Sequence, residues 1–261
     1  MVRHRGTERG VEMRKFFAAP ENVTESEITL YGSDVNHIEN VLRMKAGDKV
    51  MVSDGSRVNY LSAIKTMTDD RVELEILEKC PAKRELASAI TLYQGLPKGD
   101  KMDLITQKAV ELGASRIVPV KMQRAVVKLD DRKAEKKVSR WNKIAEGASK
   151  QSGRDVIPEV SLPLSMAEAL RDAKTLDHVL FPYELAEDMA ESAKVLRDIR
   201  PGERVGVFIG PEGGFSKEEA EEILEAGGKM MSLGKRILRT ETAALAVLAI
   251  LMFDMEKKEA E

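Results

Sequence analysis

Two consecutive strand–loop–helix units between residues 205 and 253 constrain the fold of this chain more than any other feature. The apolar run Val205–Ile209 predicts a buried strand, which ends in the turn Gly210–Gly214. Ser216 predicts the start of a helix, because a serine at the cap position followed three residues later by Glu219 can form a capping box. The glycine turn is therefore expected at the junction between a buried strand and a helix.

A second unit of the same kind follows. Met230–Leu233 predicts another strand, and the loop Gly234–Thr240 leads into a helix that Thr240 is expected to cap. The two loops should lie side by side, at the sheet edge where α/β proteins bind ligands. The first loop has neither the GxGxxG spacing of a dinucleotide fold nor the GKS or GKT ending of a P-loop. A purely structural turn is the competing interpretation of one glycine cluster, and the second loop favours ligand binding.

The apolar pattern changes its period near residue 82. Residues 1–12 are polar and lack periodicity, so we expect a disordered extension there. Residues 13–82 predict a small β-barrel-like module that contains one helix, His37–Met44. Its expected strands are Ile28–Tyr31, Lys49–Ser53, Asn59–Ile64 and Val72–Leu77.

Residues 83–261 alternate between strand-like and helical patterns. This order predicts an α/β domain whose parallel sheet is covered by helices on both faces. The expected strands are Ala89–Gln94, Ile117–Val120, His178–Phe181, Val205–Ile209 and Met230–Leu233. The expected helices are Met102–Leu112, Ala134–Lys150, Met166–Ala173, Ala186–Leu196, Lys217–Ala226 and Glu241–Phe253.

The composition limits the setting and the partners of the chain. The single cysteine, Cys80, cannot form an internal disulfide, so we expect a reducing, cytoplasmic location. The net charge of −2 argues against a surface that is basic throughout, but residues 121–154 hold eleven lysines and arginines against four acidic residues. Such a stripe suits a phosphate backbone, although a charge run is more often a solvated helix face.

Other features exclude several classes of protein. The longest uncharged apolar run, Ala243–Phe253, is too short to span a bilayer and predicts a helix covered on all sides, in part by a second subunit. The three histidines and the cysteine lack the spacing of metal ligands, so we expect no metal site. No serine or cysteine nucleophile with an accompanying base is evident. Trp141 has apolar neighbours at helical spacing and is expected in the core rather than as a base-stacking platform.

Several charged side chains are candidates for binding or catalysis, and each has a structural alternative. Glu212 is expected on the glycine loop, where a solvated carboxylate is the commoner case. Arg236 and Arg239 could hold a phosphate or a developing oxyanion, or lie on the surface. Glu241 is favoured at a helix N-terminus by the helix dipole whatever its function. Arg154 closes the basic helix, either as a simple helix-end cation or as a group that contacts RNA or takes part in catalysis.

Five segments together resemble one family of enzymes. They read HIENVLRMKAGD at 37–48, KGDKMDLITQKAVELG at 98–113, QSGRDVIPEV at 151–160, IGPEGGFS at 209–216 and LGKRILRTETA at 233–243. In this order they resemble the ribosomal RNA small subunit methyltransferase E family, a branch of the SPOUT methyltransferases. The resemblance implies a PUA-like N-terminal barrel in residues 13–82. It also implies a C-terminal α/β domain with a trefoil knot in residues 83–261, and a homodimer.

The same resemblance implies methylation of N3 of one uridine in the 16S rRNA of the small ribosomal subunit, with S-adenosyl-L-methionine as cofactor. The cofactor residues would be Phe181, Pro182, Ile209, Gly210, Pro211, Glu212, Gly213, Gly214, Leu233, Gly234, Ile237, Leu238, Arg239 and Thr240. The residues expected to contact RNA are Arg14, Lys15, Arg43, Lys101, Gln151 and Arg154. Catalysis is assigned to Arg154, Arg239 and Glu241. A non-catalytic RNA-binding factor of ribosome assembly and a SPOUT enzyme with another RNA target remain the alternatives.

Overall fold

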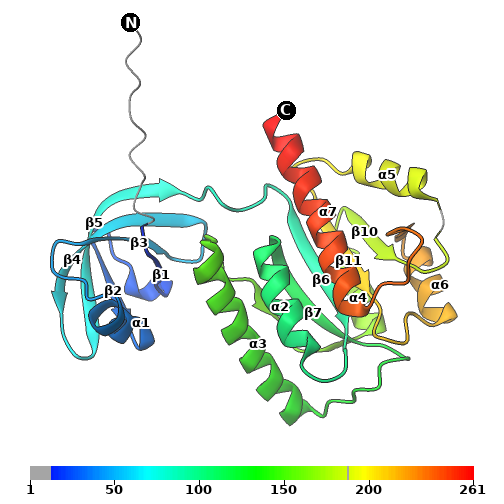
Figure 1. Cartoon of the computed structure of the whole chain (residues 1–261), viewed down its shortest axis with the longest axis horizontal. Coiled ribbons are helices and arrows are strands. Elements are labelled where there is room, and N and C mark those ends of the chain that lie inside the picture. The colour runs from blue at the N-terminus through cyan, green and yellow to red at the C-terminus, as the bar shows by residue number, and fades with distance from the viewer. Residues whose placement is uncertain (1–12, 187) are drawn as a thin grey trace, which may run out of the picture. The chain divides into compact units, whose positions relative to one another are not determined.

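The computed structural model describes residues 13–186 and 188–261, which form two compact units that divide between Arg84 and Glu85 (Figure 1). The extension predicted at residues 1–12 lies outside the described residues. Among the helices that are described, none combines the length and the hydropathy that crossing a membrane requires.

The first unit is a five-stranded sheet in the order β1-β3-β4-β5-β2. β1 and β3 pair in parallel, and the other neighbours are antiparallel. The four predicted strands are confirmed, and the short β1 adds a fifth. The strands are β1 (Lys15–Phe17), β2 (Glu27–Tyr31), β3 (Lys49–Ser53), β4 (Val58–Met67) and β5 (Arg71–Pro81), with a 3-10 turn η1 at Pro20–Asn22. Alternate residues such as Ile28, Val50 and Leu74 fill the core.

The helix of the first unit differs from its prediction. It begins earlier, as α1 (Ser33–Asn36) directly after Gly32, and continues as the π-helix η2 (His37–Val41). It ends before the predicted Met44 because the backbone of Arg43 takes a left-handed conformation, with φ at 53°.

The second unit is built on a parallel sheet with the principal order β12-β10-β11-β6-β7-β8, and β9 also pairs with β7. Its strands are β6 (Ala89–Gly95), β7 (Ala114–Lys121), β8 (Glu159–Val160), β9 (Leu164–Ser165), β10 (His178–Pro182), β11 (Arg204–Ile209) and β12 (Lys229–Met231). Its helices are α2 (Lys101–Glu111), α3 (Asp131–Ser152), α4 (Met166–Ala173), α5 (Met189–Asp198), α6 (Lys217–Glu225) and α7 (Thr240–Ala260). The predicted alternation of strands and helices is confirmed, whereas the two-residue strands β8 and β9 were not predicted.

Helices cover both faces of this sheet, as expected. Side chains of α2, α3, α5 and α7 form one core cluster, and side chains of α4 and α6 form another. Successive strand residues alternate between them, so that Val207 faces the first cluster and Phe208 the second. α2 contacts both α3 and α7, and Figure 1 shows these three helices on one face of the sheet. Trp141 is 2 % exposed and belongs to the first cluster, which confirms its predicted place in the core. The trefoil knot that the resemblance implies stays a prediction.

Candidate functional site

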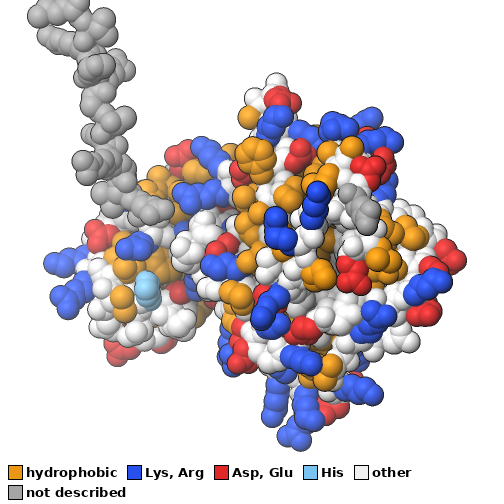
Figure 2. Space-filling view, turned by 45° about the vertical axis from the view of Figure 1, so that its right-hand side comes forward, with side chains coloured by type: hydrophobic (Ala, Val, Ile, Leu, Met, Phe, Trp, Pro, Cys, Tyr) orange, Lys and Arg blue, Asp and Glu red, His pale blue; other side chains and the backbone are white. Residues whose placement is uncertain are grey.

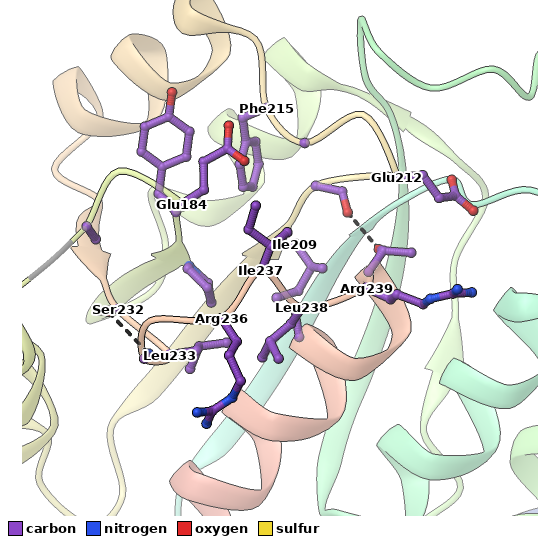
Figure 3. A pocket seen from close by; sticks show the side chains of 18 of the residues that line it. Glu184, Ile209, Glu212, Phe215, Ser232, Leu233, Arg236, Ile237, Leu238 and Arg239 are labelled. Atoms are coloured by element: carbon purple, nitrogen blue, oxygen red, sulfur yellow. Dashed lines mark hydrogen bonds between the residues drawn. The ribbon is translucent and has the colours of Figure 1, made fainter.

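Three loops at the carboxyl ends of β10, β11 and β12 enclose a cavity of about 880 Å³ (Figure 3). The three strands are parallel neighbours, so their loops open on the same edge of the sheet. The prediction that the loops after β11 and β12 lie side by side is therefore confirmed. We call this space the loop cavity.

All the residues that the sequence assigned to a cofactor line the loop cavity, except Phe181. Phe181 is fully buried, and its ring centroid lies 5.9 Å from that of Tyr183 and 5.8 Å from that of Phe215. It faces the core because alternate residues of a strand point to opposite sides of the sheet. The side chain of Phe181 therefore does not line the cavity, contrary to the prediction. It packs against Tyr183 and Phe215 and so supports the loop after β10.

Several residues that line the cavity were not predicted from the sequence, among them Glu184, Met189 and Ser232. Glu184 and Met189 follow β10, and Ser232 follows β12. Their only signal is position, since each comes within a few residues of a strand end on the ligand-binding edge. The sequence of the loop after β10 has no glycine motif that would have singled it out.

Glycines let the loop after β11 turn tightly. A Cβ atom on Gly210 would lie 3.0 Å from the carbonyl carbon of Gly214, and one on Gly213 would lie 2.9 Å from Cβ of Arg124. Gly214 has a φ of 67°, which side chains rarely adopt. The following helix α6 begins at the predicted capping box, in which Ser216 and Glu219 satisfy each other's backbone N–H groups.

Thr240 does not cap α7, contrary to the prediction. Arg239 occupies the cap position, and its side chain makes no capping hydrogen bond. The Thr240 hydroxyl instead donates to the carbonyl oxygen of Gly210 at 2.7 Å, and it accepts from Nε2 of Gln94 at 2.9 Å. The hydroxyl therefore links the loop after β12 to the loop after β11 and also contacts the buried Gln94 of β6. The sequence signal for Gln94 was its polar side chain at the end of an apolar strand, β6, where a buried amide needs hydrogen-bond partners.

A lysine between two carboxylates forms one rim of the loop cavity. Nζ of Lys101 lies 3.0 Å from Oε1 of Glu212 and 3.1 Å from Oε2 of Glu241. The hydrogen bonds with these two partners raise the pKa of Lys101. Burial raises the pKa of each carboxyl, but hydrogen bonds from Lys101 and from the backbone outweigh it, so both pKa values lie below the ordinary range. The sequence assigned Lys101 to RNA, and the structure adds that it links the glycine loop to the start of α7.

The two arginines of the loop after β12 behave differently. Arg236 and Arg239 are both exposed and line the cavity, but Figure 3 shows their side chains leaving the loop in different directions. The charge of Arg239 acts on Glu241 and helps to lower the pKa of that carboxyl. Arg239 therefore belongs to the charged rim.

Arg154 is not brought to the loop cavity within one chain. Its side chain is 5 % exposed and forms an ion pair with Glu85, whose side chain is 6 % exposed. Its guanidinium also donates to the carbonyl oxygens of Val110 and Ala114, the latter at the amino end of β7. These partners enclose the guanidinium within one chain, so the predicted contact of Arg154 with RNA or with reacting atoms stays a prediction.

The other residues assigned to RNA lie on both units. Arg14, Lys15 and Arg43 belong to the first unit, where Arg14 and Arg43 are exposed and Lys15 is half-buried. Gln151 is exposed near the end of α3. Over residues 13–186 and 188–261, no group of histidine, cysteine, aspartate and glutamate side chains is suited to a metal ion.

Comparisons with known proteins identify both units. Residues 84–252 match the family model of the RNA methyltransferase domain, and residues 30–77 match that of the RNA methyltransferase PUA domain. The chain is 36% identical to the ribosomal RNA small subunit methyltransferase E of Bacillus subtilis (strain 168), over 87% of this chain and 90% of the relative.

Two solved structures are similar to this chain in fold. One is a ribosomal RNA small subunit methyltransferase E from Neisseria gonorrhoeae bound to S-adenosyl methionine. It is 34% identical with a TM-score of 0.77, over 92% of this chain and 97% of that one. The other is a putative methyltransferase from Legionella pneumophila in complex with the same cofactor. It is 32% identical with a TM-score of 0.80, over 93% of this chain and 98% of that one.

Proposed function

We infer that this chain, which belongs to the ribosomal RNA small subunit methyltransferase E family, is an rRNA methyltransferase that uses S-adenosyl-L-methionine. We propose N3 of one uridine in the 16S rRNA of the small subunit as its target. The observation that carries the proposal is the loop cavity, which three neighbouring loops form at the carboxyl edge of the parallel sheet.

The residues present fit this cofactor. The apolar side chains of Ile209, Leu233 and Leu238 line the cavity and suit a flat adenine ring. The tight glycine turn keeps Cβ atoms out of the way, so that a ligand can approach the backbone at Gly210–Gly214. Glu212 stands at the rim and can accept hydrogen bonds from hydroxyl or ammonium groups. In the proposed function these residues hold the cofactor.

When bound, S-adenosyl-L-methionine supplies a methyl group activated by a positively charged sulfur. For transfer to uridine N3, the N3 proton would pass to solvent water, and the bond from the methyl carbon to sulfur would break as the bond to N3 forms. Arg239 is exposed at the rim, and its guanidinium is our candidate for stabilising the negative charge that develops on the uracil oxygens. A cation at this position lowers the barrier without forming a covalent bond to the substrate.

We propose that Glu241 orients neighbouring cations and does not accept the proton. Its pKa is lowered and its carboxylate is paired with Lys101, so its affinity for a proton is weak. A carboxylate at this position instead orients Lys101 and Arg239 by attraction. Arg154 is left out of the single-chain mechanism, and its part in a site completed by a second subunit stays a prediction.

We further propose that the protein acts in the cytoplasm as a homodimer. Helix α7 was predicted to be covered on all sides, yet the side chains of Ile250 and Phe253 are 39% and 69% exposed. Exposed apolar side chains on one helix mark a surface that a second protein can cover. Sedimentation equilibrium of the wild type and of Phe253→Glu tests the dimer, because a charge buried in the interface should favour the monomer.

Nucleoside mass spectrometry of 16S rRNA tests the reaction. Deletion of the gene should remove 3-methyluridine, and re-expression of the wild type should restore it. Loss of a different modified nucleoside would refute the assigned target. Failure of the purified protein to bind S-adenosylhomocysteine in calorimetry would instead support a non-catalytic assembly factor.

Arg239→Gln tests the proposed electrostatic role. We expect a turnover number lowered about 10²-fold or more, the range found when one charge-stabilising donor is removed, with little change in affinity for S-adenosylhomocysteine. Arg236→Gln is the matched control, since Arg236 lies on the same loop and points elsewhere. Equal turnover of the two variants would remove Arg239 from the mechanism.

A further inference from the structure

A second, smaller cavity lies across the first turn of α2 from the loop cavity. Its volume is about 200 Å³, and we call it the tryptophan cavity because Trp141 lines it. Consecutive residues at the start of α2 line different cavities. Lys101 lines the loop cavity, whereas Asp100 and Met102 line the tryptophan cavity. The backbone N–H of Lys98 donates to Oε1 of Glu212 at 3.1 Å, which ties the shared loop to the glycine loop. The two cavities are therefore neighbours with a common wall.

The tryptophan cavity is lined by both apolar and polar groups. Pro97, Val127 and Leu129 contribute apolar surface next to the Trp141 ring. The indole N–H is fixed by a hydrogen bond of 3.1 Å to Oδ1 of Asp103. The Trp141 ring is itself almost fully buried, so the half-buried Val127 and Leu129 offer the apolar contact for a planar heterocycle at the mouth of the cavity.

Two charged side chains give this space a preference among ligands. Nζ of Lys137 lies 5.9 Å from the centroid of the Trp141 ring and lines the cavity, where it can meet a phosphate. Asp100 also lines the cavity and is exposed, and its side chain makes no capping hydrogen bond to α2. Its carboxylate can accept from an N–H group on the edge of a base. A cation and an acceptor beside a cavity with some apolar surface match the phosphate and the base of a nucleotide.

The outer face of α3 continues the positive charge away from this cavity. Arg132, Lys136, Arg140 and Lys143 are exposed, and their spacing of four, four and three residues places them on one face of the helix. Figure 2 shows lysine and arginine side chains gathered at the lower end of the molecule, where Figure 1 draws the first turns of α3. A row of cations along one helix is complementary to a polynucleotide backbone.

We propose that the tryptophan cavity receives the base of an rRNA nucleotide next to the methylated uridine, while the α3 cations hold the phosphates that follow. This inference rests on the proposed function, because it takes the loop cavity as the place of methyl transfer. A single RNA strand splayed over the first turn of α2 would place neighbouring bases in the two cavities. RNA-binding proteins commonly read single-stranded segments by splaying bases into separate sites. The tryptophan cavity would then contribute to the choice of target.

Filling the cavity tests the proposal. Val127 is half-buried and lines the cavity, whereas Val126 is 67% exposed and does not line it. Val127→Phe should raise the KM for unmethylated small ribosomal subunits about tenfold, within the range found for the loss of one base contact. Val126→Phe, the matched control, should leave this KM unchanged. Affinity for S-adenosylhomocysteine should be the same in both variants.

A KM of Val127→Phe equal to that of Val126→Phe would overturn the proposal. A loss of affinity for S-adenosylhomocysteine in Val127→Phe would also overturn it, because the effect would then pass through the loop cavity. If Val127→Phe does not fold, Lys137→Gln should raise the KM in the same way, and an unchanged KM there would overturn the proposal. Absence of any methylation by the wild type would instead be a failure of the proposed function.

The single tryptophan of the chain gives a readout that does not depend on activity. The probe is single-stranded oligouridine RNA, added at a concentration that saturates a filter-binding assay. We expect its binding to change the fluorescence of Trp141 in the wild type and in Val126→Phe, and to leave it unchanged in Val127→Phe. Saturated wild type without a change in fluorescence would contradict occupation of this cavity.

Discussion

Replacement of Arg154 by alanine should destabilise the second unit strongly. The guanidinium and the Glu85 carboxylate are both almost fully buried, and Nε of Arg154 lies 3.2 Å from Oε1 of Glu85. Removing one partner of such a pair costs about 3–5 kcal/mol, because the other charge stays buried without compensation. The backbone N–H groups of Asp155 and Val156 still donate to Glu85, which favours the lower part of this range. Two carbonyl oxygens, those of Val110 and Ala114, also lose a donor.

The expected change in melting temperature follows from the size of the unit. A loss of 1 kcal/mol lowers the midpoint by about 2–4 °C in a unit of 150–250 residues. Arg154→Ala should therefore melt about 10 °C below the wild type in differential scanning calorimetry. Protein concentration has to be equal in all runs, since a dimer melts at a temperature that depends on it.

Arg140→Ala is the matched control for this measurement. Arg140 lies on the same helix and pairs with Asp103, but its side chain is 65% exposed. Exposed pairs contribute about 0–1 kcal/mol, so its midpoint should fall by no more than about 4 °C. Equal midpoints of Arg140→Ala and Arg154→Ala would refute the structural role derived for Arg154. If turnover of Arg154→Ala were lost at the same time, a catalytic site shared between subunits would explain the residue better.

Two further predictions concern the loop cavity. Thr240→Val keeps the shape of the side chain but removes one of the two acceptors of the Gln94 amide and the donor to Gly210. It should therefore cost about 1–3 kcal/mol in chemical unfolding and weaken S-adenosylhomocysteine binding, and unchanged values would show that the link between the loops is dispensable. Because the pKa values of Glu212 and Glu241 are lowered in the folded protein, their stabilising effect is complete above the ordinary carboxyl range and is lost as the pH falls through the lowered values. Lys101→Met should raise both pKa values and move this acid loss to higher pH, and a pH profile of unfolding identical to that of the wild type would contradict the ion-pair assignment.

Much of the second unit could be predicted from sequence because its signals are local. The strand Val205–Ile209, the turn after it and the capping box at Ser216 and Glu219 each arise within a few residues. Thr240 shows where such reasoning fails. Its local context predicts a helix cap. In the structure its hydroxyl instead forms hydrogen bonds with Gln94 and Gly210, which are distant in sequence.

The sequence alone determined that the chain alternates strands and helices, that two glycine loops meet at one sheet edge, and which family the motifs resemble. These properties depend on periodicity and on turn chemistry, which are determined by residues close together in the sequence. Only the tertiary structure decided which charged groups share a site. It brings Lys101 between Glu212 and Glu241, and it encloses Arg154 with Glu85. Burial and long-range pairing determine whether a charge stabilises the fold or remains available to a ligand, and neither can be read from the residues next to it.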